Sequence, residues 1–402
     1  MKILTVTTFF PNPTEPHRTI FVKNLVMAMR EYCAVIVVAP VSFFPPISKL
    51  RNWFTKEKIP TREFYDGLEV LHPRFLAIPK ANWWLGLGYF LGIVRQIYRL
   101  KQQHDACVIH VHCAFPDAVG VALVARVLRL PYIVTAHGSD INVYANRQLL
   151  GPQIRWALCG ASGVIAVSRE LSEKILKLTN GKIKHLVCIP CAGFQPDMFY
   201  VRNSADCRAT LGLSNETKVV VFVGNLVAIK SVETLIDAWA ALAAGGEITE
   251  RDLLVIVGDG PSRADLNQRV QSVGLTQCVR FTGTIPQSDV SNWIAASNVL
   301  CLPSRNEGTP NVVVEALASG VPVVATRVGG VPDLVRDGEN GYLVNPGLPL
   351  MLANALGEAL TRTWNKLEIQ DSVSHLTWRE LANRNCEFLE SVAHNTDPAS
   401  AK

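Results

Sequence analysis

Two carboxylates lie close together in a segment that is otherwise apolar. Glu307 and Glu315 are the only charged residues after Arg305 in S-R-N-E-G-T-P-N-V-V-V-E-A-L-A-S-G-V-P-V-V-A-T. Thr309 is a suitable N-cap and Pro310 suits the first helical position, so the pattern predicts a helix that begins there and ends near residue 318. Glu307 then lies in the loop before the helix, and Glu315 lies inside it, about 8 Å further along.

The start of this predicted helix is suited to binding an anion. Its first N–H groups are unpaired and carry partial positive charge, which favours phosphate. The spacing of Glu307 and Glu315 fits two ends of one elongated, hydroxyl-rich ligand better than one metal ion or one shared proton. The alternative is that Glu307 completes a capping arrangement and Glu315 is a surface residue. Against it, the neighbours of Glu315 leave little polar face on the helix: Val312, Val313, Val314, Ala316 and Leu317.

The elements that must position these residues alternate between apolar runs and amphipathic segments. In the first half, the runs are KILTVTTFF, AVIVVAP, LEVLHPRF, ACVIHVHC, YIVTAHG and GVIAVS. Helical patterns, such as DAVGVALVARVLRL and SRELSEKILKL, lie between several of them. Buried Val- and Ile-rich strands that alternate with helices are typical of βαβ units, which form a parallel sheet covered on both faces.

An irregular, polar segment, residues 191–206, interrupts this alternation and predicts a crossing linker. The alternation then resumes with KVVVFVGN, LLVIVGDG, CVRFTG, NVLCLPS, VPVVATRVGG and GYLV. The sequence therefore predicts an α/β protein with two tandem Rossmann-like domains, residues 1–195 and 210–374, with a boundary near 193–215. Ligands of such sheets bind at the carboxyl ends of the strands, so we expect the sites in the cleft between the domains.

One strand end, V-G-D-G-P-S-R, begins like a dinucleotide-binding fingerprint. The third glycine of that fingerprint permits close packing of helix and strand, but Arg263 occupies its position here. A second short motif, C-I-P-C, gives Cys188 and Cys191 the spacing of a metal or redox pair. There is no second CxxC, and the histidines are not placed to complete a zinc site. NAD binding and a zinc or redox role therefore stay open only as alternatives.

Composition and charge narrow the class of protein. The chain of 402 residues is 49% hydrophobic, and its ten cysteines lie mostly in apolar runs, where they resemble small buried hydrophobes. ILTVTTFF is too short to span a bilayer and lacks a cleavage site, so we expect a cytoplasmic protein, at most peripheral on the inner face of the membrane. Residues 1–200 carry 23 Lys and Arg against 12 Asp and Glu, whereas the rest carry 16 against 22. The basic half indicates an anionic partner: a phosphorylated substrate, a membrane or nucleic acid.

The block from Asn306 to Val344 closely resembles the donor-binding block of glycosyltransferase family 4. V-G-N-L-V-A-I-K-S, V-G-D-G-P, F-T-G and A-H-G-S-D-I-N agree in order, and H-L-T-W-R-E-L-A resembles the final helix of the family. The resemblance covers nearly the whole chain, weakly over residues 41–100. It implies the two-domain GT-B fold, with a helix at 376–394 that returns to the first, acceptor-binding domain. It also implies retaining transfer from a UDP- or GDP-sugar bound to the second domain, without a metal or other cofactor.

The resemblance implies roles for individual residues. Glu307 would bind hydroxyls of the donor sugar, Glu315 the ribose, and Lys230 the diphosphate. His137 would face the donor sugar through its side chain or its backbone; the alternative is that it is a hydrogen-bonded histidine at the end of a strand. Further donor contacts would come from Gly224, Asn225 and the run Gly308, Thr309, Pro310 and Asn311.

Two positions depart from the family pattern. Asn225 stands where an arginine is common, and Ser231 replaces the glycine that usually follows Lys230. One expected phosphate cation is therefore missing, and we hypothesise that Arg18 partly replaces it. The implied mechanism is front-face attack, in which the acceptor hydroxyl enters on the side from which the diphosphate leaves.

Two segments mix aromatic and basic residues, as at an anionic membrane surface: F-F-P-P-I-S-K-L-R-N-W-F-T-K-E-K-I-P and P-K-A-N-W-W-L-G-L-G-Y-F-L-G-I-V-R. A lipid-diphosphate-linked or glycan acceptor would explain both the positive charge and the aromatic residues. The alternative is that Trp83, Trp84 and Phe90 fill the core of the first domain. Three other functions stay open: a sugar-nucleotide epimerase of the same fold, a catalytically idle sugar-nucleotide-binding protein, and a nucleic-acid binder, for which no recognition motif is present.

Overall fold

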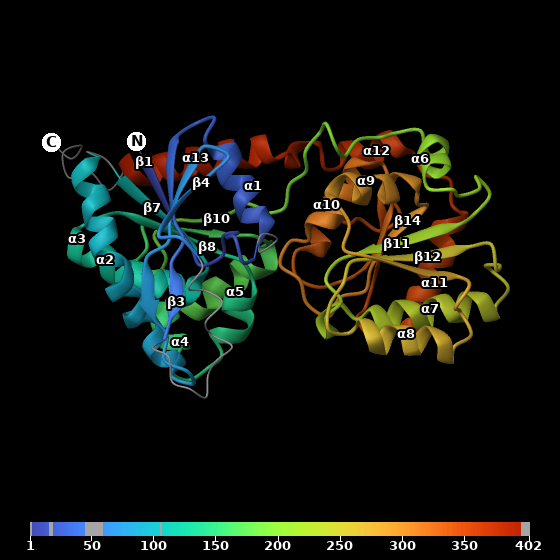
Figure 1. The fold of residues 1–402 in the computed structure, drawn as a ribbon, viewed down its shortest axis with the longest axis horizontal. Helices are drawn as coiled ribbons and strands as arrows, with labels where there is room; N and C mark the ends of the chain where they lie inside the picture. The colour runs from blue at the N-terminus through green and yellow to red at the C-terminus, as the bar shows by residue number, and fades with distance from the viewer. Residues whose placement is uncertain (1, 16–18, 45–58, 105–106, 395–402) are drawn as a thin grey trace. The chain divides into compact units, whose positions relative to one another are not determined.

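A computed structural model describes residues 2–15, 19–44, 59–104 and 107–394 (Figure 1). The chain forms two compact units. The N-terminal unit comprises residues 1–191 together with 378–402, and the C-terminal unit comprises residues 192–377. Each unit is described by itself below.

The N-terminal unit is built on an eight-stranded sheet with the order β10-β9-β8-β7-β1-β2-β5-β4. All neighbours in this sheet are parallel except β4, which pairs antiparallel with β5 at one edge. A small sheet pairs β3 with β6. The strands are β1 (Lys2–Val6), β2 (Ala34–Val38), β3 (Val41–Phe43), β4 (Arg62–Tyr65), β5 (Leu68–Leu71), β6 (Arg74–Leu76), β7 (Cys107–His112), β8 (Tyr132–Ala136), β9 (Gly163–Ala166) and β10 (Leu186–Cys188).

Helices connect these strands and cover the sheet. They are α1 (Ile20–Met29), η2 (Asn82–Trp84), α2 (Leu85–Gln103), η3 (Ala114–Ala118), α3 (Val119–Leu128), η4 (Asp140–Tyr144), α4 (Gly151–Gly160), α5 (Arg169–Thr179) and α13 (Trp378–His394). The side chain of Ser168 caps α5 by accepting a hydrogen bond from Leu171 N. The last helix, α13, packs against α1, and Cys386 Sγ lies 3.3 Å from Cys33 Sγ.

The C-terminal unit has one six-stranded, entirely parallel sheet with the order β13-β12-β11-β14-β15-β16. Its strands are β11 (Val219–Val223), β12 (Leu253–Val257), β13 (Val279–Gly283), β14 (Val299–Leu302), β15 (Val323–Thr326) and β16 (Gly341–Val344). Its helices are α6 (Ser204–Thr210), η5 (Ala228–Lys230), α7 (Val232–Ala244), α8 (Arg263–Ser272), α9 (Gln287–Ala296), α10 (Asn311–Ala318), η6 (Val331–Asp333), α11 (Pro349–Thr361), α12 (Lys366–Asp371) and η7 (Ser374–Leu376).

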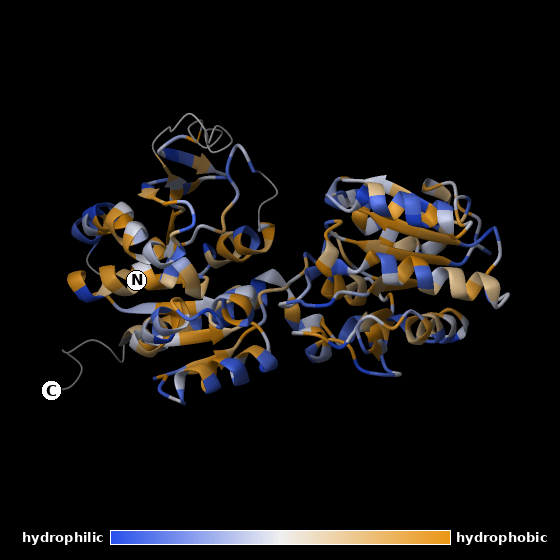
Figure 2. Cartoon of the chain, turned by 90° about the horizontal axis from the view of Figure 1, so that it is seen from below, coloured by the Kyte–Doolittle hydropathy of each residue, from blue (hydrophilic) through white to orange (hydrophobic). Residues whose placement is uncertain are grey.

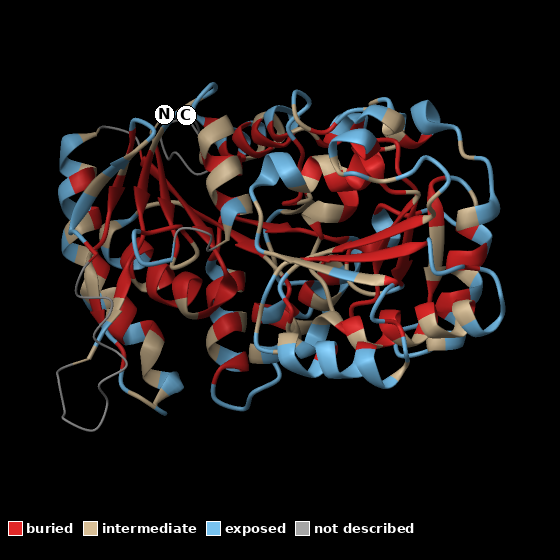
Figure 3. Ribbon diagram, turned by 45° about the vertical axis from the view of Figure 1, so that its right-hand side comes forward, coloured by how far each residue is buried: buried red, intermediate tan, exposed pale blue. Residues whose placement is uncertain are grey.

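Burial explains why the apolar runs became the central strands. Every residue of β7, β8 and β12 is buried, as expected for parallel strands covered on both faces. Figure 3 shows buried strands in each unit, and Figure 2 shows helices with one apolar and one polar face. In both sheets the loops at the carboxyl ends of the strands carry the residues predicted to bind ligand.

One local prediction was wrong. The run LEVLHPRF forms two strands, β5 and β6, because Pro73 offers no N–H to a continuous ladder. The segment predicted to be an irregular linker has no helix or strand between residues 191 and 203, and α6 begins at its end, capped by the Asn203 side chain accepting from Ala205 N. The alternative in which Trp83, Trp84 and Phe90 fill the core does not hold, because 55% of Trp83 is exposed and Trp84 and Phe90 are only partly buried.

The ten cysteines are free thiols, including Cys188 and Cys191. Among the described residues, no group of three or more His, Cys, Asp and Glu side chains could hold a metal ion. Within the same ranges, no helix combines the length and the apolar composition needed to cross a membrane.

Candidate functional site

Helix α10 begins one residue later than the sequence predicts. Pro310 is the N-cap, with φ −79° and ψ 119°, and its carbonyl accepts from Val313 N at 3.2 Å. The extended backbone of Pro310 leaves Asn311 as the first helical residue, so Thr309 is not the cap. The loop from Glu307 to Pro310 therefore leads directly to the free N–H groups of α10.

A salt bridge joins Lys230 to Glu307, although 77 residues separate them in the sequence. Lys230 Nζ lies 2.5 Å from Glu307 Oε1, and the side chains are 22% and 10% exposed. Arg305 N donates to Ile229 O at 2.8 Å and so holds the loop after β14 against the loop after β11. The sheet order explains this contact, because β11 and β14 are adjacent parallel strands whose carboxyl ends share one edge.

The glycine pair after β15 packs against the Glu307 loop. A Cβ on Gly329, which has φ +57°, would lie 2.1 Å from Glu307 O. Gly330 N donates to Gly308 O at 2.6 Å. Only glycine allows this approach, so the backbone of β15 and its following turn fix the position of the Glu307 loop.

The loop after β11 is held in a similar way by the loop after β12. A Cβ on Gly258, at φ +125°, would lie 2.0 Å from Gly224 O. Gly224 N donates to Val257 O at 3.0 Å, and Leu226 N donates to Asp259 O at 2.9 Å. Asn225 lies between these anchored residues and is exposed. The glycines of V-G-D-G-P thus support the neighbouring loop, which carries Asn225 and Lys230.

Glu315 has a different environment from Glu307. It lies within α10, is partly exposed, and accepts from Gln287 Nε2 at 3.1 Å. Burial raises the pKa of Glu315 to about 7, and the hydrogen bond from Gln287 partly opposes this shift. Glu307 is therefore paired with a cation, whereas Glu315 accepts a hydrogen bond from an amide and has a raised pKa.

His137 belongs to the N-terminal unit, at the end of β8. Its Nε2 lies 3.1 Å from His112 Nδ1, and its ring packs 5.4 Å from that of Phe21. Burial lowers the pKa of His137 to about 4, although the Asp140 carboxylate partly opposes this. Asp140 is itself buried and accepts from the amides of Ala114 and Gly138, each at 2.8 Å, so it fixes the loop that carries His137.

The C-terminal unit thus brings together the predicted donor residues from Gly224 to Lys230 and from Glu307 to Glu315. His137 lies in the other unit. Arg18 lies outside the described residues, as do Lys49, Arg51, Trp53, Phe54, Lys56 and Lys58 of the first basic and aromatic segment.

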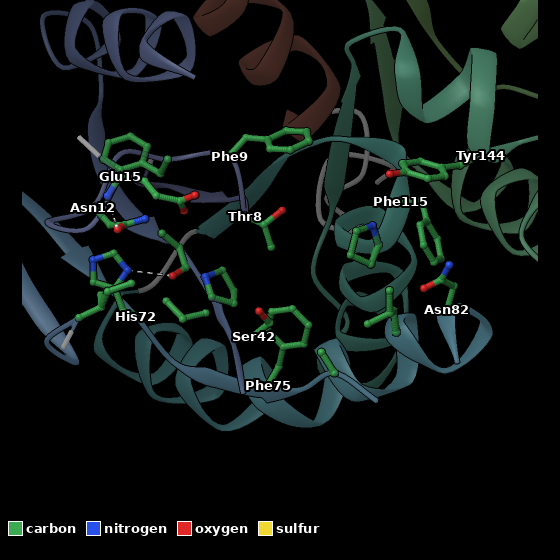
Figure 4. A pocket seen from close by; sticks show the side chains of 18 residues that line it. Thr8, Phe9, Asn12, Glu15, Ser42, His72, Phe75, Asn82, Phe115 and Tyr144 are labelled. Atoms are coloured by element: carbon green, nitrogen blue, oxygen red, sulfur yellow. Dashed lines mark hydrogen bonds between the residues drawn. The ribbon is translucent and has the colours of Figure 1, made fainter. Parts of the chain in front are cut away.

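The N-terminal unit also contains a cavity of about 310 Å³ at the carboxyl ends of its strands (Figure 4). Aromatic side chains line much of it: Phe9, Phe10, Phe75, Phe115 and Tyr144. Polar groups from the loops are interspersed: Thr8, Asn12, Glu15, Ser42, His72 and Asn82. Figure 4 shows Asn12, Glu15 and His72 on one side of the cavity and Phe115 and Tyr144 on the other. The lining residues come from separate segments of the sequence, so no single motif marks this cavity.

The comparisons with known proteins agree with this architecture. Residues 19–192 match the family described as Glycosyltransferase Family 4, and residues 217–362 match Glycosyl transferases group 1. The chain is 31% identical over 369 residues to a protein named for teichuronic acid biosynthesis, the glycosyltransferase TuaC of Bacillus subtilis (strain 168). That alignment covers 90% of this chain and 89% of TuaC.

The chain belongs to glycosyltransferase family 4. Solved structures show the same GT-B fold at lower identity. A sucrose-phosphate synthase from Thermosynechococcus elongatus superimposes with a TM-score of 0.77 at 22% identity, over 98% of this chain and 100% of that one. Anabaena Alr3699/HepE in complex with UDP-glucose superimposes with a TM-score of 0.69 at 22% identity, over 97% and 100%. This family 4 protein is thus a glycosyltransferase built from two α/β units, each with a sheet of mainly parallel strands.

Proposed function

We propose that this family 4 enzyme transfers a sugar, with retention, from a UDP- or GDP-sugar to a hydroxyl of a surface glycan or lipid-linked acceptor. The observation that carries the proposal is the pairing of Lys230 with Glu307 beside the start of α10, with Glu315 inside the same helix. These groups supply the three things that a nucleotide sugar needs: hydroxyl acceptors, a cation for the diphosphate, and free N–H donors.

In this proposal each group has a separate task. The diphosphate binds Lys230 and the backbone N–H groups of Gly308 and Asn311, and the ribose hydroxyls donate to Glu315. The Lys230 ammonium is neutralised by Glu307 at 2.5 Å. Donor binding places phosphate oxygens on the same ammonium, which frees Glu307 oxygens to accept from hydroxyls of the sugar.

The bond from the anomeric carbon to the diphosphate breaks while the bond to the acceptor oxygen forms on the same face. Lys230 and the α10 amides stabilise negative charge that grows on the departing diphosphate, which is electrostatic catalysis of the leaving group. The acceptor proton goes to the departing phosphate oxygen. Glu307 stays a hydrogen-bond acceptor and forms no covalent intermediate.

The relatives guide the choice of substrates to test. HepE of Anabaena was solved with UDP-glucose, which makes UDP-glucose the first donor to try. TuaC is named for synthesis of a surface polysaccharide, which supports a glycan acceptor. For the acceptor we propose the aromatic-lined cavity of the N-terminal unit, because aromatic faces and scattered polar groups suit a sugar unit.

We also propose a peripheral membrane contact through α2. Leu87, Leu91 and Tyr98 are 40%, 59% and 50% exposed, and their spacing of four and seven residues places them on one face. Exposed Arg95 and Arg99 lie on the same helix. An apolar face next to arginines suits an anionic bilayer surface. The test is flotation with anionic vesicles at low salt; protein that stays wholly in the soluble fraction contradicts the contact.

The division of labour is tested with a panel of nucleotide sugars. We expect Glu307→Ala to abolish transfer while leaving nucleotide binding, followed by thermal shift, largely intact. We expect Glu315→Ala to weaken nucleotide binding itself. Identical losses in both variants contradict the separate roles. Reversible isomerisation of the donor supports the epimerase alternative, and no response to any donor supports an idle binding protein.

A further inference from the structure

Three histidines of the N-terminal unit, His110, His112 and His137, have adjacent rings, and the roles given above include only His137. His110 and His112 lie two residues apart on β7, so their side chains point to the same face of the sheet. Their ring centroids are 4.3 Å apart. The ring centroids of His112 and His137 are 5.3 Å apart, and their ring planes are nearly parallel, with an angle of 20° between them. His110 and His112 are fully buried, whereas His137 is partly exposed.

His112 Nδ1 and His137 Nε2 are hydrogen-bonded at 3.1 Å, so one of these nitrogens carries a proton and donates it while the other accepts. Its direction follows from the other nitrogen of His112. That atom, Nε2, is buried and has no hydrogen-bond partner among the described residues. A buried N–H without an acceptor is rarer in native structures than a buried acceptor without a donor. His112 therefore carries its proton on Nδ1 and donates it to His137 Nε2.

His137 must then carry its own proton on Nδ1, because its Nε2 is the acceptor. The same reasoning gives the tautomer of His110. Its Nδ1 is buried and has no partner among the described residues, whereas its Nε2 lies 2.8 Å from Thr135 Oγ1, so the proton is on Nε2. Burial lowers the pKa of His110 to about 3 and also lowers the pKa of His112. The stack is thus neutral near pH 7, despite the Asp140 carboxylate beside His137.

We propose that His112 is a positioning residue that fixes His137 as a neutral imidazole protonated on Nδ1, so that His137 offers a single N–H donor to a hydroxyl of the transferred sugar. The contact between His137 and the sugar rests on the proposed function, whereas the tautomer does not. A neutral imidazole held this way is a donor and exchanges no proton in the reaction. This distinguishes the site from that of an epimerase, which needs an acid and a base around the sugar.

The tautomer is tested by NMR on the full-length chain with ¹⁵N-labelled histidine rings. Correlations between ring nitrogens and ring carbon-bound protons distinguish the two neutral forms and the imidazolium. The chain has nine histidines, and the signals of His112 and His137 are assigned by their loss in His112→Asn and His137→Asn. We expect both rings to be protonated on Nδ1 only, without titration between pH 6 and 8. A His137 ring protonated on Nε2, or one that titrates in this range, overturns the proposal.

Activity supplies the second readout through two variants of nearly equal shape. His112→Asn retains an amide donor close to the position of Nδ1, whereas His112→Leu does not. We expect kcat to fall about 10- to 100-fold in His112→Leu and at most about threefold in His112→Asn, with the KM for the donor little changed. Equal kcat in the two variants reduces His112 to a packing residue and overturns the proposal. If the wild-type chain transfers no sugar, the proposed function fails, while the ring signals still decide the tautomer.

Discussion

Replacing Glu315 with glutamine should stabilise the protein while it impairs nucleotide binding. Burial raises the pKa of Glu315 from 4.5 to about 7, so the folded state disfavours the carboxylate that the unfolded chain carries freely. The resulting cost is absent well below pH 4.5, grows as the pH rises towards 7, and is constant above that. The full shift corresponds to about 3 kcal/mol, and solvent screening at this partly exposed side chain reduces it to about 1–2 kcal/mol.

Glu315→Gln removes the charge but keeps an oxygen that accepts from Gln287 Nε2. At pH 8 we expect the midpoint of thermal unfolding of the C-terminal unit to rise by about 2–8 °C. At pH 5 the rise should be much smaller, because Glu315 is then protonated in the folded wild type. Glu216→Gln is the matched control, since Glu216 is an exposed turn residue of the same unit.

The same variant should bind UDP at least about tenfold more weakly at pH 8, because an amide cannot accept from two ribose hydroxyls as a carboxylate can. Differential scanning calorimetry of Glu315→Gln and Glu216→Gln measures the unfolding midpoint, and titration calorimetry with UDP measures the affinity. A midpoint at pH 8 that is unchanged or lower than that of wild type would refute the account of the pKa. Unchanged UDP affinity would refute the role of Glu315 in holding the ribose.

Two further substitutions test how the site is held. Lys230→Gln should lower kcat about 100- to 1000-fold, measured as nucleotide release in the presence of donor and acceptor, since it removes the cation beside Glu307; a loss below tenfold would contradict its role on the leaving group. Gly329→Ala should abolish transfer and cost more than about 3 kcal/mol in urea unfolding, because its Cβ would lie 2.1 Å from Glu307 O. Gly274→Ala, at φ +74° with nothing within 4 Å, should cost only about 1 kcal/mol and keep full activity, and equal effects of the two would show that the close contact is unimportant.

The sequence predicted most of the regular structure because the central strands are continuous Val- and Ile-rich runs. It failed where local chemistry competes with that pattern. Pro73 divides one apolar run into β5 and β6, and the Asn203 cap starts α6 at the end of the segment predicted to be irregular. Pro310 is extended and so shifts the start of α10 by one residue.

The candidate site was predicted in its parts but not in its contacts. The resemblance to family 4 selected Lys230, Glu307 and Glu315, yet only the order of the sheet brings Lys230 against Glu307. Gln287, the partner of Glu315, comes from a different helix and gave no signal in the sequence. His112 could have been found, because the alternation I-H-V-H places it on the same face of a strand as His110.

The stereochemistry of transfer tests the central claim most directly. The wild-type chain is incubated with UDP-glucose or another α-linked nucleotide sugar and a panel of glycan acceptors, and the anomeric signal of the product is followed by proton NMR. The account predicts an α-linked product formed together with the free nucleoside diphosphate, and no product from Glu307→Ala. A β-linked product, or conversion of the donor into an isomer without release of the nucleotide, would contradict it.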